Sequence, residues 1–421
     1  MKITRITGKE IFDSRGIPTV MCEMSLDDGT VVCAEVPSGT SKGDHEAMEL
    51  RDGGSRLFGM GVSKAIHNID HIIAPELIGK TPDVVIADAL MRRIDPTSDK
   101  SILGANATLA VSYAVCRAQA AANGLHLFEL ISALYDTESV SLPFPYFNMV
   151  NGGAHADNQF PIQEIMIAPI GAQNFRVGLE AAMEVFHEFQ KLLHSKGKST
   201  AVGQEGGCAP IFSSYTEPFD LLTQAIASAG HEGTFVFGID VAANQLYDRE
   251  SGLYRWGKEK VTSSDLIGIY TELFNKYSLY SIEDGCSEHD VAGWQSLYAQ
   301  LGESTQIAGD DLFVTNIEAI ARGIENELAG AVIIKPNQVG TVTESLEAIE
   351  LCHQAGLNPI ISHRSGETTD TFIADLAVGT SAGQIKAGGC SRGERIAKYN
   401  RLLWIEDMLT MSALDDHSET D

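Results

Sequence analysis

Positive charge is scarce in this chain of 421 residues. Lysine and arginine together number 30, whereas aspartate and glutamate number 57, which gives a formal net charge of −27. Phosphate backbones and anionic membrane surfaces attract basic proteins and repel acidic ones. The composition therefore argues against nucleic acid and membranes as partners, and a phosphorylated substrate would have to enter a locally basic pocket.

Long apolar runs and paired cysteines are also missing. No stretch approaches the roughly 20 apolar residues of a transmembrane helix, and residues 1–5 start a strand-like pattern instead of an apolar signal peptide. The seven cysteines form no C-x-x-C pair, and their odd number favours reduced thiols. We therefore expect a cytoplasmic protein without disulfides.

Two sequences that look like nucleotide-binding loops lack an essential glycine. Residues 79–81 read Gly-Lys-Thr, but Ala74 stands where a P-loop needs its leading glycine, and no strand precedes them. Residues 59–61 read Gly-Met-Gly, without the third glycine of a dinucleotide-binding loop. Neither sequence is assigned a function, and the second is interpreted as a turn before a helix.

The chain does contain a series of short, β-branched apolar runs, each bordered by polar or charged residues. Every run is too short for a helix and too apolar for an exposed strand, so we interpret the runs as strands buried on both faces. The runs and their bordering residues are 165–167 with Gln163 and Glu164, 201–202 with Glu205, 234–239 with Asp240, 279–282 with Glu283, 306–308 with Asp310, 331–334 with Lys335, 359–361 with Arg364, and 384–385 with Lys386.

This rhythm predicts an α/β fold. The segments between the later runs are long enough for one crossover helix each, which indicates a (β/α)8-type barrel over residues 137–421 with its active site where the strands end. Upstream, residues 3–36 alternate as a β-meander and residues 62–135 show helical patterns, so a smaller α+β domain is expected over residues 1–136. The boundary is placed at residues 137–145, where two prolines interrupt the helical pattern.

Three strand ends carry carboxylates, namely Asp240, Glu283 and Asp310. A closed barrel would bring them together, and three carboxylates at one point cannot all stay ionised without a cation. Coordination by oxygen alone favours magnesium over zinc. The alternative for each residue is a helix N-cap or a surface salt bridge. Asp311 strengthens that alternative for Asp310, because two adjacent residues cannot both face the cavity.

Two further strands end in lysine and one in an arginine-containing turn. A desolvated lysine near metal ions and a second lysine has its neutral form favoured, so Lys335 or Lys386 could act as a base. A lone lysine at a barrel rim more commonly extends into water. Arg364 lies in a turn with the hydroxyls of Ser362 and Ser365, which suits a phosphate, because arginine binds phosphate through two donors.

This set of residues suits removal of a proton next to a substrate carboxylate. The step creates a dianion, which positive charge from metal ions and a lysine would stabilise. Lys335 would take the proton. Glu205, whose neighbouring glycines allow a close approach, would then protonate a departing hydroxyl.

Short sequences along nearly the whole chain match the enolase family. They are F-D-S-R-G at 12–16, P-S-G-T-S at 37–41, N-G-G-A-H at 151–155, Q-E at 163–164, E-G-G at 205–207, S-I-E-D at 281–284, G-D-D-L at 309–312, S-H-R-S-G-E at 362–367 and A-K-Y-N at 397–400. The chain thus resembles enolases. The resemblance implies a cytoplasmic homodimer with an irregular barrel that contains an antiparallel strand. It also implies a magnesium-dependent glycolytic lyase that interconverts 2-phosphoglycerate with phosphoenolpyruvate and water.

Matched position by position, the resemblance also implies a role for each site residue. The catalytic residues would be Lys335 as the base, Glu205 as the acid and Glu164 in support. The metal ligands would be Asp240, Glu283 and Asp310 for a first magnesium ion and Ser41 for a second. The substrate contacts would be His155, Gln163, Arg364, Ser365 and Lys386.

The chain departs from the family pattern close to several of these residues. The departures are Ile17, Lys42, Asp44, Gln204, Cys208, Gly285, Cys286 and Pro336. None of them removes a chemical group that has been assigned a role. Two alternatives stay open: a paralogue that acts on a related phosphonate or carboxylate, and a binding protein whose site is vestigial. Retention of every assigned ionisable group argues against the vestigial site.

Overall fold

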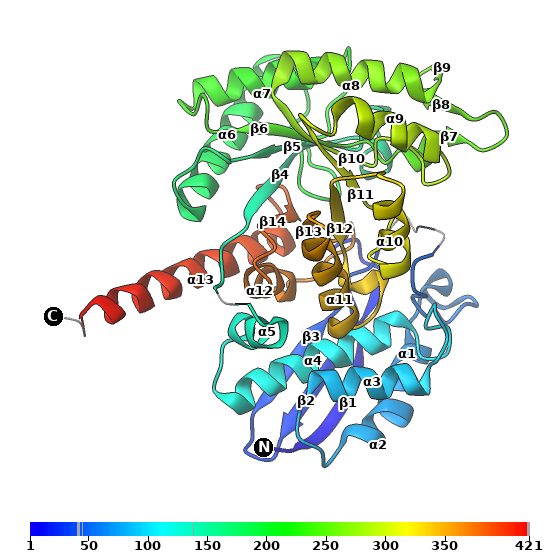
Figure 1. Cartoon of the computed structure of the whole chain (residues 1–421), viewed down its shortest axis with the longest axis vertical. Coiled ribbons are helices and arrows are strands. Elements are labelled where there is room, and N and C mark those ends of the chain that lie inside the picture. Colours follow the sequence, from blue (N-terminus) through cyan, green and yellow to red (C-terminus); the bar gives the residue numbers. More distant parts are fainter. Residues whose placement is uncertain (40–42, 44, 138, 419–421) are drawn as a thin grey trace. The chain divides into compact units, whose positions relative to one another are not determined.

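The computed structural model describes residues 1–39, 43, 45–137 and 139–418, and within them eight strands close a barrel (Figure 1). The strand order around the barrel is β10-β11-β12-β13-β14-β4-β5-β6. Strand β5 runs antiparallel to both of its neighbours, β4 and β6. The predicted fold, an enolase-type barrel after a smaller α+β region, is confirmed, including the irregular strand that the resemblance implies.

Helices alternate with most of the barrel strands. The barrel strands are β4 (Phe144–Asn151), β5 (Glu164–Ala168), β6 (Val236–Asp240), β10 (Leu279–Glu283), β11 (Gln306–Gly309), β12 (Ala331–Ile334), β13 (Asn358–Ser362) and β14 (Gln384–Gly388). The helices are α6 (Phe175–Ser195), α7 (Glu217–Ser228), α8 (Ser263–Tyr277), α9 (Val291–Leu301), α10 (Ile317–Glu325), α11 (Val342–Gln354), α12 (Phe372–Gly379) and α13 (Gly393–Ser418). A small sheet of β7 (Tyr247–Asp248), β8 (Leu253–Trp256) and β9 (Glu259–Val261) follows β6.

The N-terminal region is an antiparallel meander with helices, as predicted. Alternate residues of β2, such as Cys22 and Met24, are buried, and α4 packs on β2 and β3. Helix α4 ends at Gly124, which adopts a left-handed conformation with φ of 67°. The elements are β1 (Ile3–Phe12), β2 (Pro18–Leu26), β3 (Val31–Glu35), α1 (Ser63–Asn68), a π-helical turn (Ile69–Ile73), α2 (Ala74–Leu77), α3 (Val84–Ile94), α4 (Ala105–Asn123) and α5 (Leu127–Tyr135).

One barrel strand differs from the prediction. The sequence pattern favours a strand at residues 201–202 and an interruption at residues 137–145. The structure instead has β4 at Phe144–Asn151, whereas residues 201–202 contribute an isolated bridge between Val202 and Cys208. Proline is tolerated at the first residues of a strand, and residues 145–151 are all buried. The prolines therefore precede and begin a strand of the barrel.

The described chain forms two compact units. Unit 1 comprises Met1–Ser141, Asp310–Glu325 and Val332–Ala382. Unit 2 comprises Leu142–Gly309, Asn326–Ala331 and Gly383–Asp421. Each unit is made of segments that are distant in the sequence, and the predicted domain boundary after residue 136 stays a prediction.

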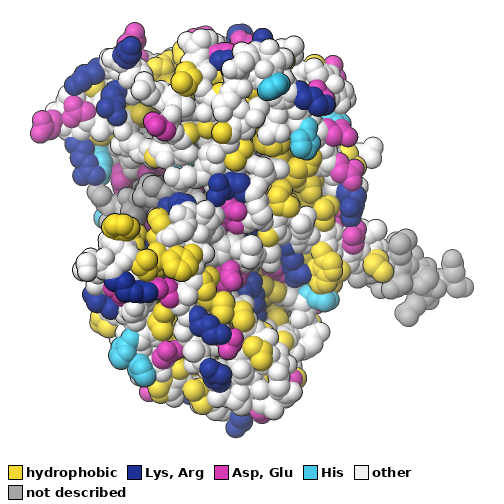
Figure 2. Space-filling model, turned by 180° about the vertical axis from the view of Figure 1, so that it is seen from behind, with side chains coloured by type: hydrophobic (Ala, Val, Ile, Leu, Met, Phe, Trp, Pro, Cys, Tyr) yellow, Lys and Arg dark blue, Asp and Glu magenta, His cyan; other side chains and the backbone are white. Residues whose placement is uncertain are grey.

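The structure bears on the cysteines, the apolar runs and the charge of the chain. Each cysteine of the chain is a free thiol. Among the described residues, no helix combines the length and the apolarity that crossing a membrane requires. On the face shown in Figure 2, acidic and basic side chains are interspersed. The excess of negative charge is therefore not gathered into a single acidic patch on that face.

Asp88 of α3 is a buried carboxylate at the first turn of α11. Its Oδ2 accepts hydrogen bonds from the backbone N–H of Thr343 at 3.0 Å and from the Thr343 hydroxyl at 2.8 Å. Burial raises the pKa of Asp88 from 3.8 to about 6, although hydrogen bonds from Ser112 and Thr343 oppose the rise. Between these two pH values the folded chain keeps a proton that the unfolded chain releases. The free energy of unfolding therefore falls as the pH rises through this interval.

The variant Asp88→Asn cannot ionise at this position and keeps an oxygen that accepts from Thr343. We expect it to exceed the wild-type chain in free energy of unfolding by roughly 1–3 kcal/mol at neutral pH. The difference should shrink as the pH falls toward 4, where the wild-type carboxyl is protonated as well. Urea unfolding of both chains across this interval measures the difference, and a constant difference would contradict the raised pKa.

Candidate active site

Three buried carboxylates lie side by side on adjacent barrel strands of unit 2. Asp240 ends β6 and pairs with Glu283, the last residue of β10, while Glu164 at the start of β5 also pairs with Asp240. Directly opposed residues project to the same face of a sheet, and neighbouring strands are about 4.8 Å apart. The exposed fraction is 1% for Glu164, 4% for Asp240 and 3% for Glu283. The register therefore concentrates negative charge at one buried level of the barrel.

Lys386 of β14 supplies an ammonium to this row of carboxylates. Its Nζ lies 3.0 Å from Asp240 Oδ2, 2.8 Å from Glu283 Oε2 and 3.2 Å from Glu164 Oε2. Burial alone would lower the pKa of Lys386, but Asp240, Glu164 and Glu283 raise it well above its usual range. Lys386 is therefore an ammonium in this site, and the carboxylates outnumber it. Hard, anionic oxygen donors of this kind fit magnesium, the metal that the resemblance implies.

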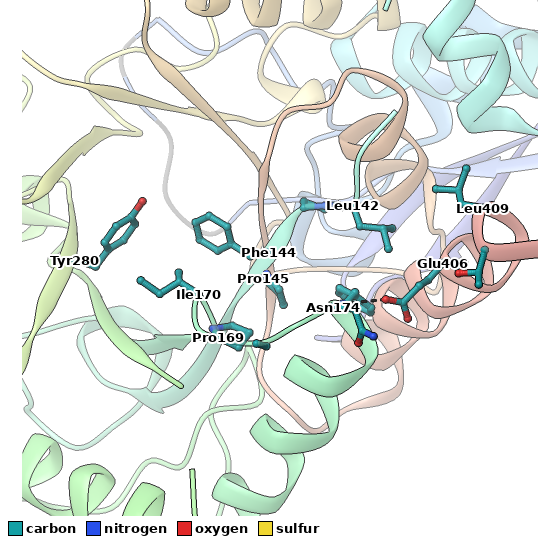
Figure 3. A pocket seen from close by; sticks show the side chains of 13 residues that line it. Leu142, Phe144, Pro145, Pro169, Ile170, Asn174, Tyr280, Glu406 and Leu409 are labelled. Carbon is teal, nitrogen blue, oxygen red and sulfur yellow. Dashed lines mark hydrogen bonds between the residues drawn. The ribbon is translucent and has the colours of Figure 1, made fainter. Parts of the chain in front are cut away.

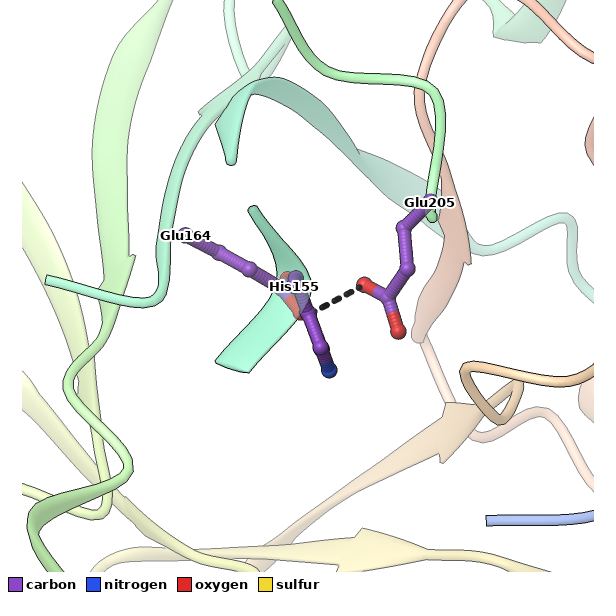
Figure 4. Close-up of side chains that lie close together, drawn as sticks. All are labelled: His155, Glu164 and Glu205. Atoms are coloured by element: carbon purple, nitrogen blue, oxygen red, sulfur yellow. Dashed lines mark ion pairs between the residues drawn. The ribbon is translucent and has the colours of Figure 1, made fainter. Parts of the chain in front are cut away.

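A second cluster shares Glu164 with this row. Figure 4 shows the side chains of Glu164 and Glu205 approaching His155 from opposite sides, with Nδ1 of His155 3.3 Å from Glu164 Oε1 and 3.6 Å from Glu205 Oε2. One possible ligand atom from each residue lies within 4.8 Å of the other two. Burial, followed by the charge of Glu205, raises the pKa of Glu164 well above its usual range. The carboxyl of Glu164 therefore binds a proton more readily than a carboxyl in water does, and it lies next to the predicted acid.

The loop that carries Glu205 is held against the chain after β14. The backbone oxygen of Glu205 accepts from the N–H of Gly389 at 2.7 Å. Gly206 has a φ of +93°, and a Cβ there would lie 2.6 Å from the backbone oxygen of Ser391. A residue with a side chain would be strained and would collide at this position. The glycine after Glu205 is thus required for the close approach that places the carboxylate.

In unit 1, the predicted base is paired with a predicted metal ligand. Lys335 directly follows β12, and its Nζ forms an ion pair with Oδ2 of Asp310, which directly follows β11. Gln338 Nε2 donates to the other oxygen of Asp310 at 3.3 Å. The backbone N–H of Lys335 donates to Thr315 Oγ1 at 2.8 Å. Both side chains are therefore held at the ends of their strands.

Arg364 and Ser365 are also placed within unit 1. Nη1 of Arg364 donates to Glu46 Oε1 at 2.7 Å and to Asn337 Oδ1 at 3.0 Å. Nη1 of Arg15 donates to Ser365 Oγ at 3.4 Å. Arg364 and Ser365 are 5% and 6% exposed. This turn therefore carries a buried guanidinium, the group that a phosphate contact requires, and Glu46 is its partner in unit 1.

The structure groups the predicted residues within each unit. In unit 2 it brings together His155, Gln163, Glu164, Glu205, Asp240, Glu283 and Lys386. In unit 1 it pairs Lys335 with Asp310 and places Arg364 beside Ser365. A ligand shared by Asp310, Asp240 and Glu283 stays a prediction, since these residues belong to different units. The predicted metal ligand Ser41 lies outside the described residues.

Several polar residues of the site are missing from the sequence-based set. Asn148 of β4 donates to Glu205 Oε2 at 3.3 Å, and Gln245 donates to Gln163 Oε1 at 2.9 Å. Gln338 and Glu46 contact Asp310 and Arg364. Asn148 could have been found if β4 had been recognised, because the residue interrupts an otherwise apolar strand. Gln245 and Gln338 each end a short 3₁₀ turn, Glu46 lies in a loop, and none of the three carries a local signal.

Two cavities of unit 2 differ in their relation to these residues. One of about 470 Å³ is lined by Gly153, Phe160, Gln245 and Arg255, among others, and borders the turn that carries His155. The other, of about 840 Å³, is mainly apolar and is lined by Phe144, Ile170, Tyr280 and Leu409, among others (Figure 3). Phe144 begins β4, whereas Asn151 at its other end pairs with Glu164. The larger cavity therefore lies at the opposite strand ends from the carboxylates.

Comparison with protein families accounts for both parts of the chain. A family model described as the enolase N-terminal domain matches residues 3–131. A second model, described as the enolase C-terminal TIM barrel domain, matches residues 139–418. The second match alone spans more than half of the chain and contains the carboxylate row, Lys386 and Lys335. The barrel, its antiparallel strand and these matches lead to one conclusion: the chain belongs to the enolase family.

Proposed function

We propose that this chain is a phosphopyruvate hydratase, a magnesium-dependent hydro-lyase that interconverts 2-phospho-D-glycerate with phosphoenolpyruvate and water. The observation that carries the proposal is the buried row of Glu164, Asp240 and Glu283 around the Lys386 ammonium, next to the Glu205 carboxylate. This arrangement combines a site for a cation, a fixed positive charge and a pair of carboxyl groups for proton transfer.

Asp240, Glu283 and Asp310 would hold the first magnesium ion, and Ser41 would contribute to a second. When bound, the metal supplies positive charge beside the substrate carboxylate. Asp310 has two roles in this proposal. It would help to hold the metal ion, and its ion pair with Lys335 fixes the position of the lysine Nζ.

Lys335 Nζ would take the proton from C2 of the substrate, and the electron pair would move toward the carboxylate group. The Lys386 ammonium would stabilise the negative charge that develops there. Glu205, in its protonated form, would then give its proton to the hydroxyl that leaves C3 as water, and would become a carboxylate. Glu164 would support this transfer, since it faces the same imidazole as Glu205 and its pKa is raised by burial and by Glu205.

The phosphoryl group would contact Arg364 and Ser365, while His155 and Gln163 would contact the rest of the substrate. Arg364 would supply the positive charge that a phosphorylated substrate needs in a chain with a net charge of −27. We further propose that the protein acts in the cytoplasm in glycolysis, as a homodimer with domains at residues 1–136 and 137–421.

A direct test follows phosphoenolpyruvate formation from 2-phosphoglycerate with magnesium and with an excess of chelator. Turnover that requires magnesium is the expected result. The same preparation is offered related phosphonates and hydroxy-carboxylates, because Gln204, Cys208, Gly285, Cys286 and Pro336 depart from the family pattern next to site residues. Weak turnover of 2-phosphoglycerate beside strong turnover of another acid would replace the proposal with a paralogue of different substrate.

A further inference from the structure

The guanidinium of Arg364 is already bound by a carboxylate of its own chain. Nη1 lies 2.7 Å from Glu46 Oε1, and Nη2 lies 3.4 Å from Glu46 Oε2. Both side chains are 5% exposed. Burial lowers the pKa of Arg364, but the carboxylates of Glu46, Asp310 and Glu49 together more than compensate, so that the pKa is raised. Glu46 therefore neutralises the buried cation through two parallel contacts.

A phosphoryl group would need the same edge of the guanidinium. Arginine recognises carboxylate and phosphate through the same pair of Nη donors, with two hydrogen bonds side by side. Two acceptors cannot occupy that edge in the same geometry. A substrate phosphate and the Glu46 carboxylate therefore compete for Arg364.

The surroundings of Arg364 determine which group must move. Asn337 Oδ1 accepts from Nη1 at 3.0 Å and holds the guanidinium from another direction. The backbone of Gly39 lies so close that a side chain there would collide with Nη2 and the guanidinium carbon. The guanidinium therefore cannot shift toward Gly39 to offer a second edge. Glu46 is the partner that has to leave.

We propose that Glu46 is an internal competitor that sets the affinity and the charge selectivity of Arg364 for the phosphoryl group. The inference rests on the proposed function, which assigns the substrate phosphate to Arg364. A phosphoryl group carries about −1.5 to −2 charges at neutral pH. Its electrostatic attraction to the guanidinium is therefore stronger than that of the singly charged Glu46 carboxylate. A monoanionic ligand that displaces Glu46 replaces one single negative charge with another, so the displacement brings no electrostatic gain. Glu46 therefore makes Arg364 selective for dianions.

The test is calorimetric titration of the full chain with inorganic phosphate and, separately, with acetate, at constant ionic strength. We expect Glu46→Gln to bind phosphate about tenfold more tightly than the wild-type chain and to gain detectable acetate binding. Glu46→Asp keeps the charge but shortens the side chain, so its phosphate affinity should lie between those of the wild-type chain and Glu46→Gln. Tighter binding is a gain that general damage to the fold does not produce, and the aspartate variant serves if the glutamine variant fails to fold.

Glu49→Gln is the matched control. Glu49 lies in the same segment, pairs with Arg51 and also acts on Arg364 through its charge. The control therefore removes the same charge without removing the direct contact, and its phosphate affinity should stay within about twofold of wild type.

Arg364→Met separates the inference from the proposed function. If this variant loses phosphate binding while Glu46→Gln binds no more tightly than wild type, the competition is refuted and the phosphate site stands. If Arg364→Met binds phosphate as well as wild type does, the phosphate does not contact Arg364, and the proposed function loses that contact. Equal gains in the Glu46 and Glu49 variants would also refute the inference, since long-range charge would then explain both.

Discussion

Lys335→Ala is expected to stop exchange of the C2 hydrogen of 2-phosphoglycerate with solvent deuterium and to lower kcat by roughly 10²–10⁴-fold. Under the proposed function, Lys335 Nζ is the group that receives this hydrogen as a proton, so neither exchange nor elimination can begin without it. Exchange is measured by proton NMR in deuterated, magnesium-containing buffer. Turnover is measured on the same sample by the phosphoenolpyruvate formed.

Glu205→Gln separates the second proton transfer from the first. The amide keeps the size of the side chain and can accept the hydrogen bond from Asn148 Nδ2, which is 3.3 Å from Glu205 Oε2. It cannot donate a proton to the departing hydroxyl. This variant is therefore expected to retain C2 exchange while losing phosphoenolpyruvate formation.

The control for both variants is Lys276→Ala. Lys276 lies in unit 2 with its side chain 51% exposed and pairs with Asp220 on the surface, so exchange and turnover should match wild type. Loss of exchange in both active-site variants would show that the two residues do not divide the steps as proposed. Exchange at the wild-type rate in Lys335→Ala would assign the base to another residue.

Strand ends were the part of the site that the sequence could predict. Asp240, Glu283 and Lys386 lie in or end strands whose apolar residues are buried on both faces, and such strands have a local signature. Their convergence then follows from closure of the barrel. Glu164 is predicted for the same reason, since it starts the buried run of β5.

Strand β4 was not predicted, because its first residues do not look like those of a central strand. Proline at 143 and 145 is typical of a break in a helix or a central strand, and the residues that make β4 a barrel strand come later. Asn148 interrupts the apolar run, and β4 pairs in parallel with β14 on one side and antiparallel with β5 on the other. Strand β14 is distant from β4 in the sequence, and a loop separates β5 from β4. No local sequence pattern therefore predicts that β4 pairs with these two strands.

The partners of the site residues could not be predicted, because they depend on distance in space. Glu46 and Arg364 are 318 positions apart, and Lys386 and Asp240 are 146 positions apart. Register is equally decisive, because a slip of one residue in β5 would turn Glu164 to the other face of the sheet. Periodicity identifies the residues of this site, whereas closure and register decide which of them touch.

The contacts of Lys386 lead to the largest expected change in stability. Lys386→Met keeps the length of the apolar stem but removes the ammonium that contacts Glu164, Asp240 and Glu283. Removing one member of a buried charge cluster leaves the others uncompensated in a low-dielectric site, which costs about 3–5 kcal/mol. We expect a loss of this size in the free energy of unfolding, measured by urea denaturation with chelator present.

Lys276→Met serves as the control for the loss of a lysine charge. Its exposed pair with Asp220 is screened by water, so the free energy of unfolding should change by less than about 1 kcal/mol. A similar small change in Lys386→Met would show that its ammonium does not offset the charge of the three carboxylates.

The response to magnesium shows whether Lys386→Met loses stability through the missing charge or through altered packing. A cation bound by Asp240 and Glu283 offsets the negative charge that the missing ammonium leaves behind, and a ligand that binds the folded chain stabilises it in proportion to its affinity. Magnesium should therefore raise the unfolding midpoint of the variant more than that of the wild-type chain. If the lost stability came from the packing of the lysine stem, magnesium would raise both midpoints equally. An equal rise in both midpoints would therefore refute the electrostatic role of Lys386. No rise in either chain would refute the proposed magnesium site.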